Sequence, residues 1–309
     1  MRPNKTDKND ARSLAITQET FNRQPISKEK IVYIKLRDWS RYYSQVNHDL
    51  VTNKNRLHRC LQLTFPEIED FLSNTDGELY WNIVKLFPTS EKVLEYDLSQ
   101  LPWIVKSSTR KNMSLDRVSK LSRKLVELAK LSYSTVECDV ASYQARKIAQ
   151  ELIELDQEKE MIIDKMLELG KDLSELNNLM SIPGIGEKTA ILTIAEIGDF
   201  RRFSSPNKIN AYIGIDLRHY ESGNYVAGDH ISKRGSKYAR KILYQAIKCI
   251  VSASRYYSNH IADYYQKKKA TSSSTKKVAI SSIHRLIRTM YHLIINDQTY
   301  DYSKAIPKS

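Results

Sequence analysis

The sequence predicts a mainly α-helical fold, and three observations support that prediction. Apolar residues recur at helical spacing over a long stretch that ends at Met180. Prolines divide an earlier part of the chain into short segments. Only nine glycines occur in 309 residues, and seven of them fall between Gly184 and Gly235. Since glycine supplies backbone freedom, tight turns are expected to gather in that one region.

The N-terminal half predicts a succession of helices with one exception. Residues 1–20 predict a helix that begins at Thr6, a favoured N-cap residue. Residues 31–35, with the sequence IVYIK, predict one short strand. A long helix is expected over 36–65, and a further helical segment is expected to begin near Leu115. The prolines that separate shorter helices between these two segments are Pro66, Pro88 and Pro102.

A heptad seam precedes the glycine-rich region. Its ten positions alternate in steps of four and three residues, and nine of them are apolar. These positions are Ile148, Leu152, Leu155, Lys159, Ile162, Met166, Leu169, Leu173, Leu176 and Met180. Two interpretations fit such a seam: self-association of residues 148–180 as a coiled coil, or one half of a helical hairpin within the chain. The narrowness of the seam favours self-association, so we expect a homo-oligomer.

The stretch IPGIGEKTAILTIAEIG has the form of a helix-hairpin-helix. Pro183 ends the incoming helix, and Gly184 and Gly186 allow a tight turn. A new helix then begins, with Lys188 in its first turn. Glycines let a phosphate approach the bare backbone, and a helix N-terminus presents free N–H groups to it. We therefore expect this turn to bind a phosphodiester irrespective of base sequence, and the alternative is an ordinary turn between two helices.

The charge of the chain is concentrated in one segment. The formal net charge is +13, and the segment 230–296 alone carries fourteen Lys and Arg residues against one acid, Asp263. This asymmetry favours a nucleic-acid partner over a solvated basic surface, because the cations lie on apolar-periodic helices and not in a loose tail. A basic helix is expected to begin near Ser236. Its cations fall on one helical face at Lys237, Arg240 and Lys241.

Composition argues against several other classes of protein. The three cysteines, Cys60, Cys138 and Cys249, lie far apart and form neither a disulfide framework nor a zinc motif. No apolar run is long enough to span a bilayer, and the N-terminal sequence MRPNKTDKND lacks the apolar core of a signal peptide. The sequence thus predicts a cytoplasmic protein with free thiols and no membrane partner.

The run from Ile182 to Leu243 closely resembles the transposase half of the DEDD transposases of insertion sequences, the one-hundred-and-ten group, which are also described as bridge-RNA-guided recombinases. The matching motifs are IPGIGEKTA, EIGDFRRF, AYIGI, SG and ISKRGSKYARKIL, in the family's order. The N-terminal KTDKNDARSLA is similar to the last carboxylate motif of the family's RuvC-like domain. The resemblance implies four parts: a RuvC-like remnant over 1–66, a helical insertion over 67–135, a coiled coil over 136–180, and a mostly helical transposase domain with a helix-hairpin-helix over 181–309.

The resemblance also implies roles for individual residues. Ser222 matches the family's nucleophilic serine, which would carry DNA strands through a serine–phosphodiester intermediate. Asp7 and Asp10 match the last two acids of the D-E-D-D set, and their i, i+3 spacing suits a shared Mg²⁺ site. From their charge and position, we further expect Lys233, Arg234 and Arg240 to neutralise the phosphate charge near Ser222. The partners implied are DNA and a guide RNA.

One departure from the family pattern concerns the beginning of the sequence. The family's first Asp and its Glu lie upstream of the Asp pair, and only six residues precede Asp7 here. The resemblance therefore predicts an N-terminally truncated copy with an incomplete Mg²⁺ site. Two functions stay open at this stage: a transposase that exchanges DNA strands through Ser222, and a catalytically inactive nucleic-acid-binding remnant.

Overall fold

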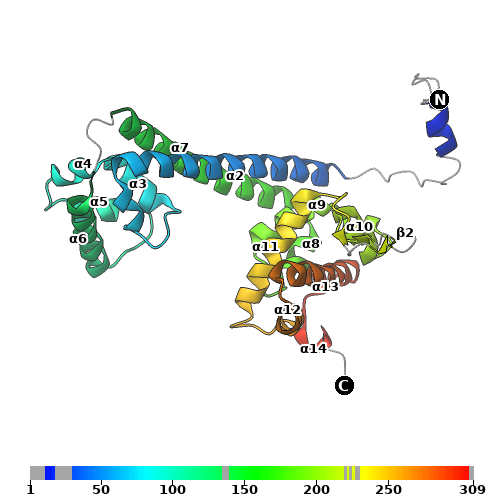
Figure 1. Cartoon of the computed structure of the whole chain (residues 1–309). Coiled ribbons are helices and arrows are strands. Elements are labelled where there is room, and N and C mark those ends of the chain that lie inside the picture. Colours follow the sequence, from blue (N-terminus) through cyan, green and yellow to red (C-terminus); the bar gives the residue numbers. More distant parts are fainter. Residues whose placement is uncertain are drawn as a thin grey trace.

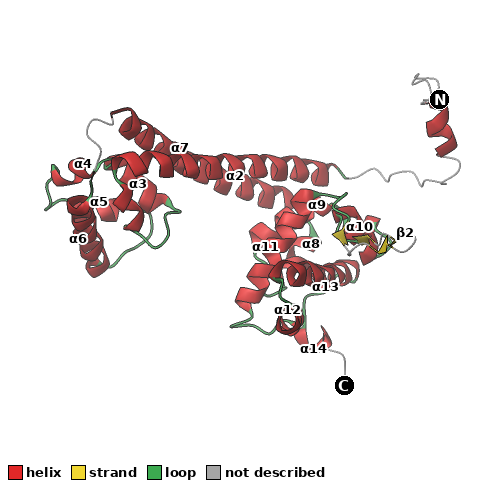
Figure 2. Ribbon diagram, in the orientation of Figure 1, coloured by secondary structure: helices red, strands yellow, loops and turns green. Residues whose placement is uncertain are grey.

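A computed structural model describes residues 11–17, 30–133, 139–218, 221–222, 225–226 and 230–305. Within these ranges the fold is mainly α-helical, as the sequence predicted (Figures 1 and 2). Residues 11–17 are helical. The further elements are α2 Ile31–Thr64, η1 Pro66–Asp70, α3 Glu78–Leu86, α4 Ser90–Leu94, α5 Leu101–Ser107, α6 Leu115–Leu131, α7 Asp139–Gly170, α8 Ser174–Met180, α9 Glu187–Ile197, η2 Phe200–Arg202, α10 Pro206–Ile213, β1 Leu217–Arg218, β2 Glu221–Ser222, β3 Tyr225–Val226, β4 His230–Ile231, α11 Lys237–Ala253, α12 His260–Thr271, α13 Thr275–Ile295 and α14 Tyr302–Ala305.

Two long antiparallel helices, α2 and α7, run side by side and connect two lobes of the molecule (Figure 1). The distal lobe contains η1 and α3–α6, and the C-terminal lobe contains α8–α13. Helix α2 has 34 residues, which at about 1.5 Å per residue gives a length of about 50 Å. The helical pair therefore sets the separation between the lobes.

Each lobe has its own hydrophobic core, and the long helices contribute to both. Leu36 and Val46 of α2 belong to the core of the C-terminal lobe, whereas Leu50 and Leu57 of the same helix belong to the core of the distal lobe. Helix α7 likewise contributes buried residues to both hydrophobic cores. Because one helix is buried in both cores, its two halves cannot shift independently without exposing apolar surface.

The prediction of a strand over residues 31–35 is wrong, because these residues form the first turns of α2. Tyr33, Leu36 and Ser40 recur at helical spacing and are buried against the C-terminal lobe. The hydroxyl of Tyr33 donates a hydrogen bond of 2.8 Å to Oε1 of Glu175 on α8. Tertiary burial of one helical face thus outweighs the local β propensity of Ile, Val and Tyr.

The heptad seam does not lie on one continuous helix. Helix α7 ends at Gly170, and α8 begins at Ser174. A Cβ on Gly170 would lie 2.5 Å from Cδ1 of Ile191, so α9 packs closely against the end of α7. The seam residues Ile162 and Met166 are fully buried within the single chain, where α7 packs along α2. The intramolecular hairpin is therefore present, and self-association through 148–180 stays a prediction.

Helix α9 is the central element of the C-terminal lobe. Every residue from Ala190 to Ile197 is buried, and α2, α7, α8 and α11 all contact this helix. Helix α11 begins at Lys237, as the sequence predicted, and the hydroxyl of Ser236 caps it by accepting a hydrogen bond from the N–H of Ala239. Among the described residues, no helix combines the length and apolar character needed to cross a membrane.

The packing of α7 leads to a first prediction, which compares two positions of the same seam. Ile162→Ala removes a fully buried side chain and should lower the free energy of unfolding by about 2–4 kcal/mol. Leu169→Ala, at a side chain that is 36% exposed, should cost less than about 1 kcal/mol. Chemical denaturation measures both. Equal losses would show that the seam is buried by a second copy of the chain as well.

Candidate nucleic-acid interface

The predicted nucleophile Ser222 belongs to β2, which lies at the outer end of a small two-part β structure (Figure 1). Strand β1 pairs with β4, and strand β2, which contains Ser222, pairs with β3 so that Ser222 is the register partner of Tyr225. The structure thus describes the backbone at Ser222. Asp7 and Asp10 lie outside the described residues, so their predicted proximity to Ser222 stays a prediction.

The base of this β structure is held by three hydrogen bonds. The Ser232 hydroxyl donates to Oδ1 of Asp216 at 2.6 Å, and the Ser232 N–H donates to the Asp216 carbonyl at 2.9 Å. The N–H of Lys233 donates to the Gly214 carbonyl at 3.0 Å. Lys233 has a φ of 54°, in the left-handed region that residues with a side chain rarely occupy. The two strands that lead toward Ser222 therefore leave the lobe from a fixed backbone frame.

A half-buried histidine lies beside this frame. His284 of α13 makes a backbone hydrogen bond with Ile215 and lies near the charge of Asp216. Burial, together with the positive charge of Arg288, lowers the pKa of His284 below its ordinary value, and Ile215 and Asp216 oppose that shift only in part. The lowered pKa favours the neutral form of the His284 imidazole.

Two glycines let the frame pack closely against the start of α11. A Cβ on Gly214 would lie 2.5 Å from the nitrogen of Gly235, and a Cβ on Gly235 would lie 2.1 Å from the Tyr212 carbonyl oxygen. Nη1 of Arg240 donates to the carbonyls of Ile213 and Gly235, at 2.7 and 3.0 Å. Arg240 thus stabilises the junction between α10 and α11, and its contact with phosphate stays a prediction.

The two glycines of the PGIG turn have different surroundings. Gly184 has a φ of +94°, and a Cβ there would lie 2.6 Å from the Cα of Ile250 on α11. The side-chain amide of Asn259 also holds this turn by donating to the Pro183 carbonyl at 3.1 Å. Gly184 is therefore explained by close packing within the protein. Gly186, at the N-cap of α9, is exposed, and a Cβ added to it would meet no atom within 4 Å.

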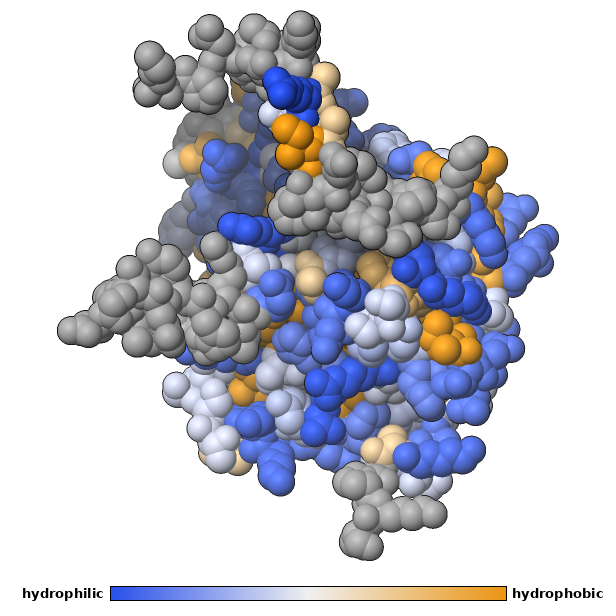
Figure 3. Space-filling view, turned by 90° about the vertical axis from the view of Figure 1, so that its right-hand side faces the viewer, coloured by the Kyte–Doolittle hydropathy of each residue, from blue (hydrophilic) through white to orange (hydrophobic). Residues whose placement is uncertain are grey.

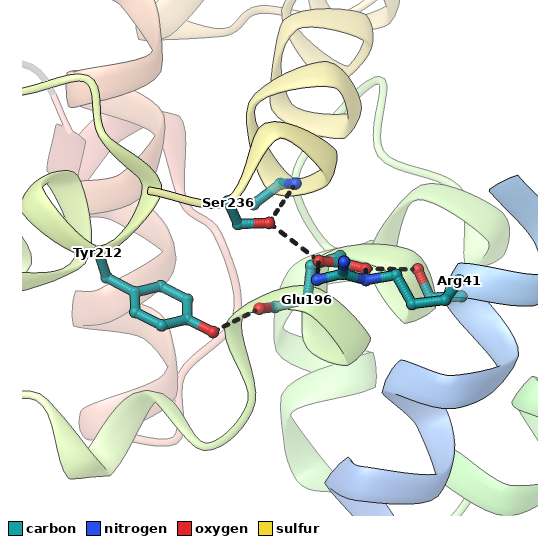
Figure 4. Close-up of polar contacts among 6 residues, drawn as sticks. Arg41, Glu196, Tyr212 and Ser236 are labelled. Carbon is teal, nitrogen blue, oxygen red and sulfur yellow. Dashed lines mark hydrogen bonds and ion pairs between the residues drawn. The ribbon is translucent and has the colours of Figure 1, made fainter. Parts of the chain in front are cut away.

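A buried carboxylate joins the elements that carry these features (Figure 4). Oε1 of Glu196 accepts hydrogen bonds from the Ser40 hydroxyl at 3.0 Å and from Nε of Arg41 at 2.9 Å. Oε2 accepts from Nη2 of Arg41 and from the Ser236 hydroxyl, both at 3.0 Å. The Tyr212 hydroxyl donates to the Glu196 backbone carbonyl. One residue of α9 thus fixes α2, α10 and the N-cap of α11.

Most of the predicted nucleic-acid-binding cations are exposed on the C-terminal lobe. Arg41, already paired with Glu196, stacks its guanidinium 3.9 Å from the ring centre of Tyr238. The molecular face in Figure 3 is largely hydrophilic, with scattered apolar side chains. The predicted cations whose side chains are exposed are Lys188, Lys233, Arg234, Lys237 and Lys241. A polyanion could therefore reach them without a change of fold.

Metal binding cannot be assigned to the described residues. In those ranges, no group of three or more His, Cys, Asp or Glu side chains is arranged to hold a metal ion. The predicted Mg²⁺ ligands, Asp7 and Asp10, lie outside the described part of the chain.

Comparison with known proteins identifies the family. One family model, described as "Transposase IS116/IS110/IS902 family", matches residues 176–266, and a second, the DEDD transposase model of IS110 elements, matches residues 1–66. Together they cover about half of the chain, including the PGIG turn, the β structure and the basic helix α11. The chain belongs to the IS110 family of transposases.

Similar proteins include two transposases and a pilin gene-inverting protein. The transposase of insertion sequence element IS1328 from Yersinia enterocolitica is 29% identical over 126 residues, which is 41% of this chain and 37% of that protein. The transposase of IS1111A from Coxiella burnetii is 30% identical over 88 residues, 28% of this chain and 24% of the relative. The pilin gene-inverting protein of Moraxella bovis is 29% identical over 132 residues, 41% of this chain and 40% of the relative. The chain thus spans less than half the length of each.

Three residues that form contacts in the C-terminal lobe were not predicted from the sequence. Glu196, Asp216 and His284 come together with their partners only through the fold. The one local signal was the pair Ile215–Asp216 at the end of the motif AYIGI, where an acid directly follows an apolar run. Nothing in the sequence near Glu196 indicates that its partners Ser40 and Arg41 lie about 155 residues earlier.

The surroundings of the two PGIG glycines lead to a second prediction. Gly184→Ala should lower the free energy of unfolding by about 2 kcal/mol or more, because the methyl group meets the α11 backbone in a strained conformation. Gly186→Ala should leave stability within about 0.5 kcal/mol, because its φ of −91° suits alanine and the space is open. Thermal unfolding of both variants tests this. A tolerated Gly184→Ala would contradict the packing account.

Proposed function

We propose that this chain acts on DNA as an IS110-family transposase, exchanging strands through a serine–phosphodiester intermediate on Ser222. The observation that carries the proposal is the position of Ser222 on a β structure whose base is fixed next to the basic helix α11, within the segment that the transposase model matches. A phosphate held by the exposed cations of this segment would lie on the same lobe as the serine.

The proposed chemistry conserves the phosphodiester bond energy. The Ser222 hydroxyl oxygen attacks phosphorus, a serine–phosphate bond forms, and the bond from phosphorus to one deoxyribose oxygen breaks. The serine proton leaves to a base, and the departing strand receives a proton to end in a free hydroxyl. Attack by the hydroxyl of a different strand end on the phosphoserine then rejoins the DNA and regenerates serine.

The surrounding residues would serve binding and proton transfer. Lys233, Arg234 and Lys237 would neutralise the phosphate charge, and Gly186 with Lys188 would contact a neighbouring phosphate at the N-terminus of α9. His284, half-buried near Asp216 on the same lobe, would accept the proton. Asp7 and Asp10 would hold Mg²⁺, which supplies charge neutralisation at phosphate.

The relatives support DNA as the substrate class. Two of them are named as transposases of insertion sequences and a third as a gene-inverting protein, and both names denote DNA rearrangement. A guide RNA remains part of the proposal through the family resemblance. Self-association would bring two serine sites to one DNA junction.

A second function, nucleic-acid binding without strand exchange, is favoured by the exposed cations of the C-terminal lobe. These cations need no catalytic group to attract a polyanion. A protein that used this basic surface alone would bind DNA or RNA, or join an assembly of active copies, without forming a covalent intermediate.

The experiment that separates the two functions is covalent trapping of labelled DNA. The protein is incubated with Mg²⁺ and labelled insertion-sequence ends, with and without transcribed flanking RNA, and resolved on a denaturing gel. Strand exchange predicts a protein–DNA adduct that Ser222→Ala abolishes while DNA affinity stays within about twofold. His284→Asn should slow adduct formation most above pH 7 if His284 accepts the proton.

Two outcomes would overturn the proposal. An adduct that persists in Ser222→Ala would remove this serine from the reaction. Tight DNA binding with no adduct under any of these conditions would establish the binding function instead. Ser232→Ala, at the base of the β structure, is a matched control for a serine that holds a backbone frame, and it should lower stability and not specifically remove the adduct.

A further inference from the structure

The distal lobe has a strongly uneven distribution of charge. Residues 66–100 contain eight acids and two Lys or Arg residues, whereas residues 101–133 contain eight Lys or Arg residues and two acids. The two halves cancel in the total charge of the chain, so composition alone conceals them. The basic half consists of α5, the loop 108–114 and α6.

All eight cations of this basic half are exposed: Lys106, Arg110, Lys111, Arg117, Lys120, Arg123, Lys124 and Lys130. Two of them have acidic partners, since Arg110 lies 3.4 Å from Glu78 and Lys120 lies 2.8 Å from Asp116. Within the described ranges, no ion pair engages the other six. Neighbouring cations without acidic partners repel one another and attract a polyanion.

An exposed tryptophan lies on α5, the helix that packs against α6. Trp103 of α5 is 71% exposed, whereas Trp81 of the same lobe is 2% exposed. Leu101, Ile104 and Val105 are buried, so α5 is anchored in the core while the Trp103 ring projects outward. Lys106 is one turn further along α5, on the same side as Trp103. An exposed indole beside cations is the combination that stacks on an unpaired base and binds its phosphates.

From this arrangement we infer that the α5–α6 face of the distal lobe is a second nucleic-acid-binding surface, for a segment with unpaired bases. The cations of α6 bind consecutive phosphates, and Trp103 stacks on one base. This surface is separate from the proposed strand-exchange site, because the long helices α2 and α7 lie between the two lobes (Figure 1). It does not depend on Ser222 or on catalysis.

A cavity with an excess of acidic side chains borders this face. Its volume is about 660 Å³, and its charged lining consists of Arg110, Lys111 and Arg117 together with Asp76, Glu78, Asp156 and Glu160. Carboxylates repel a phosphodiester, so the backbone of the nucleic acid is kept outside the cavity and on the α6 face.

Fluorescence of Trp103 tests this surface directly. The full chain is titrated with a 20-nucleotide oligothymidylate, the matching oligouridylate and a duplex of equal length. Trp103 emission should be quenched by the single strands more than by the duplex, and the signal should disappear in Trp103→Phe. Trp103→Ala should weaken single-strand binding about tenfold. The DNA and RNA arms show whether the surface distinguishes the sugars.

A charge-reversal variant provides a second test of this surface. The triple variant Lys106→Glu, Arg117→Glu, Lys124→Glu should bind at least tenfold more weakly and should reduce the slope of log affinity against log salt by about 2. A control with three reversals on other exposed cations, at Lys92, Arg146 and Lys147, should lose less than threefold. Circular dichroism checks that both variants are folded.

Three results would overturn the inference. Absence of Trp103 quenching would exclude base stacking there. Equal losses in the triple variant and its control would show that only overall charge attracts the nucleic acid. A Trp103→Ala variant that keeps its nucleic-acid affinity but sediments as a smaller species would assign the face to contact between protein chains.

Discussion

The buried carboxylate of Glu196 is the interaction on which the arrangement of the C-terminal lobe depends. An ionised carboxylate in a protein interior is costly unless its oxygens are fully hydrogen-bonded and its charge is paired. The two carboxylate oxygens of Glu196 accept four hydrogen bonds. The donors are the hydroxyls of Ser40 and Ser236 and two guanidinium nitrogens of Arg41. Since the Ser236 hydroxyl also caps α11, the same group that satisfies Glu196 fixes where the basic helix begins. The carboxylate therefore couples α2 and α9 to the surface proposed to bind DNA.

Helix α2 connects the Glu196 cluster to the distal lobe, because this helix is part of both hydrophobic cores. The helix contributes Arg41 to the Glu196 cluster and, farther along, Leu57 to the core of the distal lobe. A rigid element that is buried at both ends transmits orientation between them, so the two basic surfaces are held at a defined separation. Glu175 reinforces the same junction, since it accepts a hydrogen bond from Tyr33 and pairs with Arg201. Burial and the hydrogen bond to Glu175 raise the pKa of Tyr33, so this hydroxyl stays protonated throughout the physiological range.

The sequence predicted features that depend on local pattern and missed those that depend on distant contacts. The mainly helical fold, the long helix after residue 35 and the start of α11 follow from periodicity and from the capping residue Ser236, and the structure confirms them. The prediction of a strand over 31–35 was wrong because burial of Tyr33 against α8 determines the conformation of that segment. No local sequence pattern contains this information. The sequence predicted phosphate approach at Gly184 but could not show that α11 packs against this glycine, and the phosphate contact itself stays a prediction. Of the site, the exposed cations could be predicted from charge, whereas Glu196 and His284 required the fold.

Hydrogen exchange of the first turn of α11 in Glu196→Gln tests the central claim most directly. Glutamine places N–H groups where an oxygen now accepts bonds, so Arg41 or Ser236 must lose its partner, at a cost on the order of 2 kcal/mol. The account predicts that amides at the start of α11, including that of Ala239, exchange faster in Glu196→Gln, whereas those of the distal lobe are unchanged. Glu187→Gln, at an exposed position of the same helix, should leave the α11 amides as in the wild type. Unchanged protection of the α11 amides in Glu196→Gln would contradict the claim that this carboxylate positions the basic helix.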